Sequence, residues 1–261
     1  MSLWLGLLPG GDAPEVLAER ALAAGCPLDV SSAPSLWGSF LAGKGAEISV
    51  FGGSEARFAS SAGRAGRLVE AHLVGVLSSF HGDVLGTYFL CVDGLNDDQR
   101  AGATEALSRA VADGSVARAG VYSESGAGGD FVCGPMNPLY TITKRPQVAC
   151  RTLNWAHGVA FCALPGPWRL RNLTLSFYGM SVVQALLARA LSSGDVLVGV
   201  RTVGEIDEAL DAQGKSPPDG LDAMLAEFAK AYGDDANWRE LVDDEREWVR
   251  EAAQRRTCHA G

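Results

Sequence analysis

The sequence predicts an α/β protein built as one (β/α)8 TIM barrel, with two extra helices at its C-terminal end. Short β-rich runs alternate with helical periods almost from the first residue, and eight strand–helix units fit within roughly 215 residues, a length typical of such a barrel. Several of the strand runs are almost continuously apolar, which is typical of strands buried on both faces. The 261 residues are 47% hydrophobic, so one deep core is expected.

The predicted strands are short apolar runs separated by turn residues or helical periods. In chain order they span 3–8, 27–30, 47–51, 84–92, 117–122, 147–153, 159–164 and 195–200. A Gly-rich loop at 124–134 separates the fifth strand from the sixth.

The predicted helices carry apolar residues at helical spacing. Asp12 is expected to cap a helix that runs through Ala24, and Ser181 one that runs through Leu191. The remaining helices span 36–42, 64–80, 97–112, 139–144, 203–212, 219–232 and 236–253. We therefore interpret 1–261 as a single domain, with the barrel at 1–212 and acidic C-terminal helices at 213–261.

A doubly wound open sheet is the competing fold. It more usually has five to seven strands and a Gly-rich first turn that binds phosphate. Residues 9–12, with the sequence Pro-Gly-Gly-Asp, fit that turn poorly. The strand count and this turn favour the barrel.

Charge argues against one class of partner. Acidic residues outnumber basic ones 31 to 22, for a net charge of −9, which argues against a nucleic-acid binder that neutralises phosphates. The excess is local, because residues 205–250 hold 14 acids and 5 bases and the rest of the chain is neutral. An anionic ligand near that segment would meet repulsion.

No apolar run reaches the roughly 20 residues of a membrane helix, and the N-terminus lacks the basic start of a secretory signal. The cysteines form no CxxC pair and no tight cluster with the four histidines, so no metal site is predicted. They are Cys26, Cys91, Cys133, Cys150, Cys162 and Cys258. We expect free thiols in a reducing, cytoplasmic compartment, with organellar import left open.

Three segments together resemble a known family. They are ALAAGCPLDVSSA (21–33), the stretch from GDVLGTYFLCVDG to ALSRAVADGSVARAGVYS (82–123), and YGMSVVQALLARALSSGDVLVGVRTVGEIDEALDA (178–212). In this order they resemble the second, fourth to fifth, and seventh to eighth units of the aldo-keto reductases, a family that includes potassium-channel β subunits. The resemblance covers about residues 3–212 and implies the barrel fold.

The resemblance implies hydride transfer from a nicotinamide cofactor to a carbonyl, assisted by an aspartate, a tyrosine, a lysine and a histidine. It places Asp29 on the family's aspartate. The tyrosine position holds Pro34, the lysine position falls at residues 51–53 (Phe-Gly-Gly), and the histidine position holds Cys91. Three of the four catalytic residue types are therefore missing.

The cofactor positions implied by the resemblance are also altered. Tyr122 and Ser123 stand where the family has the serine–asparagine pair that holds the carboxamide. Cys150 stands for the glutamine of the sixth strand, and Leu164 for the aromatic residue that stacks on the nicotinamide.

At the eighth unit, Gly199 and Arg201 keep the family's Gly-x-Arg, a phosphate contact. Glu205, Asp207 and Glu208 follow, and they would place carboxylates where a 2′-phosphate lies. The cofactor expected from these positions is none, or weakly bound NADP(H).

Two functions follow from this pattern. The first is a reductase-like barrel that has lost catalysis and serves as a binding or structural component of a larger assembly, with protein partners. The alternative is an NAD(P)-dependent oxidoreductase that reduces a carbonyl substrate with a rebuilt site of Tyr122 and Asp29. The pattern favours the first.

Each candidate residue also has a plain structural interpretation. Asp29 is suited to a turn in which it accepts from the amides of Ser31 or Ser32. Cys91 would need a nearby base to act as a nucleophile and is otherwise a small buried hydrophobe. Tyr122 ends the fifth strand and either supplies a proton or packs under the loop that follows.

Overall fold

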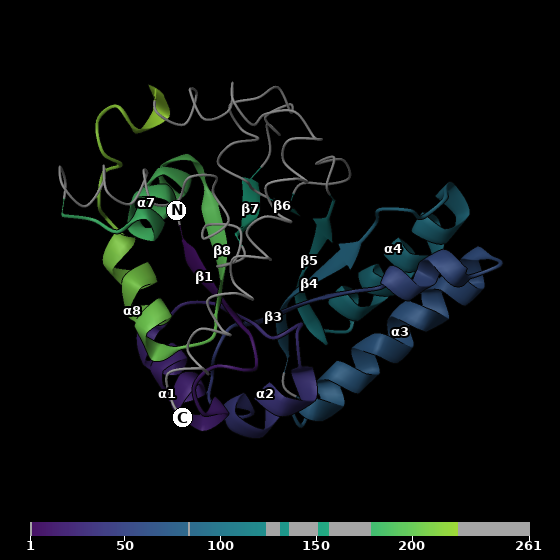
Figure 1. The fold of residues 1–261 in the computed structure, drawn as a ribbon. Helices are drawn as coiled ribbons and strands as arrows, with labels where there is room; N and C mark the ends of the chain where they lie inside the picture. Colours follow the sequence, from purple (N-terminus) through teal and green to yellow (C-terminus); the bar gives the residue numbers. More distant parts are fainter. Residues whose placement is uncertain (1, 83, 124–130, 136–150, 157–178, 224–261) are drawn as a thin grey trace, which may run out of the picture.

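A computed structural model describes residues 2–82, 84–123, 131–135, 151–156 and 179–223 of the chain. Its strands form a closed barrel in which β1 to β8 follow one another in sequence order and every neighbouring pair is parallel. The first strand pairs with the last and closes the ring, with helices outside it (Figure 1). The predicted fold class is confirmed.

Five of the predicted strands match the first five strands of the barrel within two residues at each end, and the last matches β8. The strands are β1 (Leu3–Leu7), β2 (Leu28–Asp29), β3 (Ile48–Gly52), β4 (Leu85–Cys91), β5 (Val116–Tyr122), β6 (Phe131–Pro135), β7 (Arg151–Ala156) and β8 (Asp195–Val200).

The sixth and seventh strands were predicted wrongly. β6 lies inside the segment predicted as a Gly-rich loop, and the predicted sixth strand at 147–153 overlaps β7 instead. The run at 131–133, Phe-Val-Cys, is short and flanked by glycines, so its β-forming character was hidden by the loop composition around it. The predicted strand at 159–164 and helix at 139–144 lie outside the described residues.

The helices follow their strands along the chain. They are α1 (Pro14–Ala24), α2 (Pro34–Leu41), α3 (Ala62–Ser79), α4 (Asp97–Ala112), α7 (Val182–Ser193) and α8 (Val203–Ala212), with a 3-10 turn η1 (Ser54–Phe58) before α3. Of these, α3, α4, α7 and α8 begin at residues whose side chains cap them. Ser181 caps α7 as predicted. Asp12 does not cap α1, because Ala13 takes the N-cap position of that helix. The chain becomes helical again at Leu221, and residues from 224 on, including most of the predicted C-terminal helices, lie outside the described part.

The core has two layers. The larger layer joins strand residues such as Leu5 and Val50 to helix residues such as Leu17 and Val69, and it lies between the barrel wall and the helices. The smaller cluster contains residues from strands alone, so it lies inside the barrel. Its members are Trp4, Phe89, Cys133 and Leu197, with Phe51, Tyr122 and Phe131 packed against them.

Two findings bear on the excluded function classes. In the described part of the chain, no helix is both long and apolar enough to cross a bilayer. The same residues contain no group of three or more His, Cys, Asp or Glu side chains arranged to hold a metal ion. Cys26, Cys91 and Cys133 are free thiols, and the other three cysteines lie outside the described residues.

Candidate functional site

Asp29 ends β2 and is almost fully buried, with 2% of its surface exposed. Its Oδ1 accepts a hydrogen bond from the Ser31 amide at 3.3 Å, and its Oδ2 accepts from the Ser31 hydroxyl at 2.9 Å and the Ser49 hydroxyl at 3.2 Å. The predicted turn, with Asp29 accepting from Ser31, is therefore present. All of these partners are neutral donors, so no cation faces the carboxylate through a hydrogen bond.

Burial raises the pKa of Asp29 to about 7, and the hydrogen bonds from Ser31 and Ser49 only partly oppose that rise. An aspartate with its ordinary pKa is charged at neutral pH and has no proton to give. With a pKa near 7, a large share of Asp29 side chains carries a proton at neutral pH.

The neighbouring catalytic positions hold unlike groups. Pro34 is the first residue of α2. Phe51, on β3, stacks on Phe89 with ring centroids 4.7 Å apart. Cys91 ends β4 and is half-buried, and burial together with the negative charge of Asp93 raises the pKa of its thiol to about 11. A thiol with that pKa stays protonated at neutral pH, which argues against the nucleophile hypothesis.

Tyr122 ends β5 beside Cys91, with which it is in register. Its ring meets Phe51 edge to face, at a centroid distance of 5.5 Å. The hydroxyl of Ser123 donates to Asp93 at 3.1 Å, and the Ser123 amide donates to the carbonyl of Cys133 at 2.9 Å. Ser123, which the resemblance places at a carboxamide contact, thus takes part in hydrogen bonds within the chain.

One cofactor position inferred from the resemblance, the sixth-strand residue, is assigned to the wrong strand. The strand after β5 is β6, so a sixth-strand residue belongs at 131–135 and not at Cys150, which precedes β7. The stacking position was placed at Leu164 by the same shift in strand numbering, and Leu164 lies outside the described residues. Cys133 is the buried middle residue of β6.

The N-terminus of α8 is closed by carboxylates of the chain itself. Glu205 Oε2 accepts from the Arg201 amide at 2.5 Å and from the Thr202 amide at 3.3 Å. Asp12 Oδ2 accepts from the Val203 amide at 2.8 Å. Backbone amides at a helix N-terminus are where an anion binds, and here two side-chain anions already hold them.

Gly199 lies on β8, directly before this turn and in register with Gly6 of β1. The loop from β1 packs closely on the turn, since a Cβ at Gly11 would lie 2.0 Å from the carbonyl oxygen of Arg201. This contact places Asp12 against α8 and explains why it does not cap α1.

Asp207 and Glu208, the other two acids predicted at the phosphate position, have partners away from the N-terminal turn of α8. Asp207 pairs with Arg20 of α1 at 2.7 Å, and Glu208 accepts from the hydroxyl of Ser181. The prediction that three carboxylates gather at one phosphate position is therefore wrong for Asp207 and Glu208. Only Glu205 of that group lies at the turn.

The sequence interpretation missed a polar group in the barrel interior. Arg118, on β5, donates from Nε and Nη2 to Thr87 Oγ1 of β4, at 3.2 Å and 3.0 Å. The signal was available, because alternation along β5 places Arg118 on the same side as Tyr122, and alternation along β4 places Thr87 with Phe89.

Comparisons with known proteins extend this geometry. The chain superposes on an aldo/keto reductase from Brucella melitensis with a TM-score of 0.66 at 15% identity, over 87% of this chain and 94% of that one. It matches the apo form of an aldo-keto reductase from Bacillus halodurans with a TM-score of 0.62 at 13% identity, over 88% and 90%. It matches the aldose reductase from Schistosoma japonicum with a TM-score of 0.64 at 12% identity, over 87% and 88%.

The chain has the aldo-keto reductase fold. No family model and no curated protein sequence matches it. At these identities the likeness extends to the barrel and its order of elements alone, so the chemistry has to be argued from the side chains.

Proposed function

We propose that this chain is an aldo-keto reductase-like barrel without reductase chemistry that serves as a binding component of a larger protein assembly. The observation that carries the proposal is the replacement of the reactive groups at the C-terminal mouth, which we define as Asp29, Phe51, Cys91 and Tyr122 with the N-terminus of α8. Phe51 fills the lysine position with an aromatic ring packed on Phe89 and Tyr122. At the lysine and histidine positions the described chain therefore offers Phe51 and Cys91, neither of which is a cation that could assist a proton donor in hydride transfer.

The residues present do not fit a nicotinamide dinucleotide phosphate well. A phosphate at the N-terminus of α8 would have to displace Asp12 and Glu205 from the amides they hold, and it would meet their charge. We therefore propose that NADP(H) binds weakly or not at all, with a dissociation constant no tighter than about 0.1 mM.

A surface on the α3 side supports a binding role. Phe58 is 71% exposed, and its neighbour Arg57 lies 4.7 Å from the centre of its ring. The turn that carries them is held rigidly, because Gln99 of α4 donates to the carbonyls of Arg57 at 3.0 Å and Ala59 at 2.8 Å. A rigid, exposed aromatic residue beside a guanidinium is typical of an interaction hot spot.

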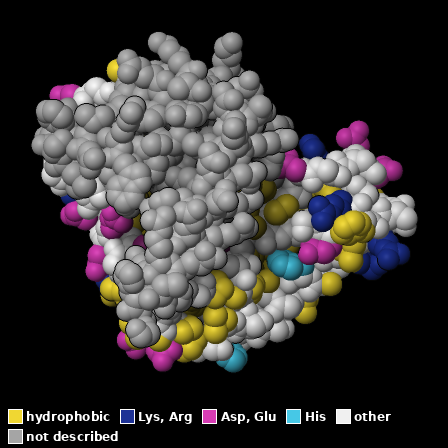
Figure 2. All heavy atoms as spheres, in the orientation of Figure 1, with side chains coloured by type: hydrophobic (Ala, Val, Ile, Leu, Met, Phe, Trp, Pro, Cys, Tyr) yellow, Lys and Arg dark blue, Asp and Glu magenta, His cyan; other side chains and the backbone are white. Residues whose placement is uncertain are grey.

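Arginines extend this surface onto α3. Arg64 and Arg67 are exposed, and neither they nor Arg57 has an ion-pair partner among the residues the structure describes. Figure 2 shows basic and hydrophobic side chains next to one another on the flank of the molecule where α3 and α4 lie. The partner that fits this surface is an acidic protein segment that offers a hydrophobic contact.

The first test is for turnover. We expect no measurable reduction of 4-nitrobenzaldehyde or 9,10-phenanthrenequinone with NADPH or NADH, because general-acid and electrostatic assistance are lost together and each is typically worth ~10²–10⁴ in rate. Turnover near 1 s⁻¹, an ordinary enzyme rate, that disappears in Tyr122→Phe would contradict the proposal. The proposal that NADP(H) binds weakly or not at all is tested by calorimetry. A micromolar dissociation constant for NADPH, with binding lost in Arg201→Glu, would contradict it.

One observation favours the alternative, a carbonyl reductase with a rebuilt site. Asp29 is partly protonated at neutral pH and lies near Cys91, whose pKa its charge also raises. If activity is found, its loss in Asp29→Asn together with Tyr122→Phe would establish the rebuilt site.

The second test is for assembly. The untagged protein, isolated from its source and run on native size exclusion, is expected to elute above the mass of one chain with a protein partner in fixed ratio. Phe58→Ser combined with Arg57→Glu should release it as a monomer, while Val16→Ser, which alters another exposed apolar residue on α1, should not. Elution of the unmodified protein as a free monomer would contradict the assembly role.

A further inference from the structure

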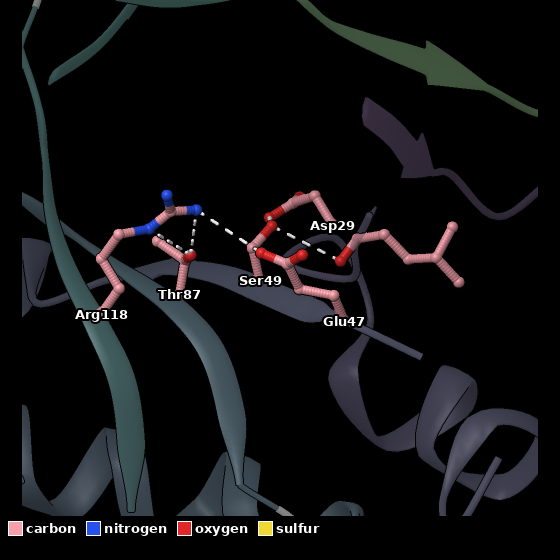
Figure 3. A network of polar contacts seen from close by, with 6 residues as sticks. Asp29, Glu47, Ser49, Thr87 and Arg118 are labelled. Atoms are coloured by element: carbon pink, nitrogen blue, oxygen red, sulfur yellow. Dashed lines mark hydrogen bonds and ion pairs between the residues drawn. The ribbon is translucent and has the colours of Figure 1, made fainter. Parts of the chain in front are cut away.

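A row of polar side chains crosses four neighbouring strands of the barrel. Asp29, Ser49, Thr87 and Arg118 are in register from β2 to β5, each opposite the next. Figure 3 shows these four side chains next to one another, with Glu47 among them and in contact with Arg118. The interior of such a barrel is normally filled by apolar branched side chains, and buried polar groups are costly there.

Arg118 is the charged member of this row. Its guanidinium lies 4.0 Å from the ring centre of Phe131 on β6 and 5.6 Å from that of Trp4 on β1. Since β1 and β5 stand on opposite sides of an eight-stranded ring, Arg118 reaches across the interior. Its side chain is nevertheless 43% exposed, so solvent reaches a charge that faces an aromatic wall.

The Arg118 guanidinium uses only some of its N–H groups in hydrogen bonds. Nε and Nη2 bond to Thr87, and Nη2 also lies 3.5 Å from Glu47 Oε1, whereas Nη1 bonds to no atom of the described residues. The contact with Glu47 is long, and the Glu47 side chain is 47% exposed. A pair of that kind contributes little and is readily replaced by another anion.

Trp4 supplies a second unused donor. Its side chain is buried at 3% exposure, and its indole Nε1 donates to no acceptor among the residues that the structure describes. Folded proteins contain few buried donors of this kind, and one that lies against a cation with a free N–H group indicates a place for an acceptor. Trp4 and Arg118 both belong to the N-terminal halves of their strands, and the guanidinium carbon lies 5.6 Å from the centre of the Trp4 ring. The mouth, in contrast, lies at the C-terminal ends of the strands.

We propose that this lower interior, formed by Trp4, Thr87, Arg118 and Phe131, binds a small organic carboxylate. The planar guanidinium matches the two oxygens of a carboxylate, and charge-assisted bonds of this type are among the strongest in proteins. Hydrogen bonds of about 2.9 Å at each oxygen allow one carboxylate to reach both the Arg118 and Trp4 donors. The ring of Phe131 then packs on the apolar body of the ligand.

The test uses the full chain with tryptophan labelled by ¹⁵N at the indole nitrogen. The Trp4 signal is assigned by its disappearance in Trp4→Phe, and the probe is benzoate, with neutral benzamide as its matched control. We expect benzoate to shift the Trp4 indole signal saturably and benzamide to leave it unchanged. No saturable shift with benzoate up to about 10 mM, above a millimolar dissociation constant, would overturn the proposal.

Variants then identify the binding residues. Arg118→Gln is expected to weaken benzoate binding about tenfold or more, since it removes the charge-assisted bonds. Glu47→Gln is expected to strengthen binding several-fold, because it removes the competing carboxylate, and this gain cannot arise from misfolding. Arg64→Gln, an exposed arginine on α3, is the control and should bind as the unmodified protein does. Equal affinity in Arg118→Gln and Arg64→Gln, or no gain in Glu47→Gln, overturns the assignment.

Discussion

At the C-terminal mouth of the barrel the carboxylates accept hydrogen bonds from donors of the chain itself. Asp29 accepts from Ser31 and Ser49, and the amides of α8 are held by Asp12 and Glu205. In the lower interior, in contrast, Trp4 Nε1 and Arg118 Nη1 have no acceptor among the described residues.

The difference shows that two barrels with the same fold can have their ligand sites in different places. Barrels of this class carry their active sites at the mouth, yet here the described carboxylates of the mouth, Asp29, Asp12 and Glu205, accept hydrogen bonds from the chain's own donors. A buried donor without an acceptor lowers the stability of the fold, so its presence in a folded chain suggests a function. We infer that the lower interior, and not the mouth, is where this barrel meets a small molecule.

The largest expected effect concerns Asp29 and pH. Its pKa is about 7 in the folded protein against 3.8 ordinarily, so the unfolded chain releases this proton first as pH rises. Stability from Asp29 is therefore full below pH 4 and is lost as pH rises through 7, by up to about 4 kcal/mol. Asp29→Asn should raise the free energy of unfolding at pH 8 by up to that amount and change it little at pH 4.

Urea unfolding of both proteins across this pH range measures the effect. An Asp29→Asn variant that is less stable than the unmodified protein at pH 8 would show that the mouth needs the charged carboxylate. That result would support a functional site at the mouth and would weaken the contrast with the lower interior.

The second prediction compares Thr87 with Arg118. Thr87 is fully buried and accepts two bonds from Arg118, so Thr87→Val should cost about 1–2 kcal/mol in unfolding free energy. Arg118→Met should change stability by less than about 1 kcal/mol, because a methionine packs on Phe131 and a charge leaves the interior. Chemical denaturation of both variants and of the double variant gives the coupling between them.

A loss in Arg118→Met as large as that in Thr87→Val would make Arg118 a structural residue. The lower interior would then resemble the mouth, with its polar groups kept for stability. The comparison between the two regions therefore depends on this pair of variants.

Most of the fold was predictable because each element signals itself locally. The capping pairs Asn96 with Gln99 and Ser181 with Gln184 are three residues apart and begin helices at the predicted places. β6 was missed because pairing with β5 and β7 determines it, and its own five residues lie among glycines. Strand pairing is a long-range property that a short run does not encode.

The candidate site was predictable only in part. The Asp29 turn follows from the sequence, since an aspartate two residues before a serine readily accepts from its amide. Its raised pKa does not, because burial is set by packing from Ser49 and other strands. Asp12 was assigned to the helix beside it in sequence, whereas a close approach at Gly11 brings it to α8, 191 residues away.

The smallest expected effect tests how the mouth is closed. Asp12→Ala removes the acceptor of the Val203 amide, a bond of 2.8 Å at the first turn of α8, and should cost about 1 kcal/mol in unfolding free energy. The control is Asp207→Ala on the same helix, whose exposed ion pair with Arg20 should be worth less than about 0.5 kcal/mol. Thermal unfolding with inorganic phosphate present adds a second measurement. Phosphate should stabilise Asp12→Ala more than the unmodified protein, because the freed amide of Val203 can donate a hydrogen bond to a bound phosphate. Equal costs for the two substitutions, with no added effect of phosphate, would mean that Asp12 does not close this helix to anions.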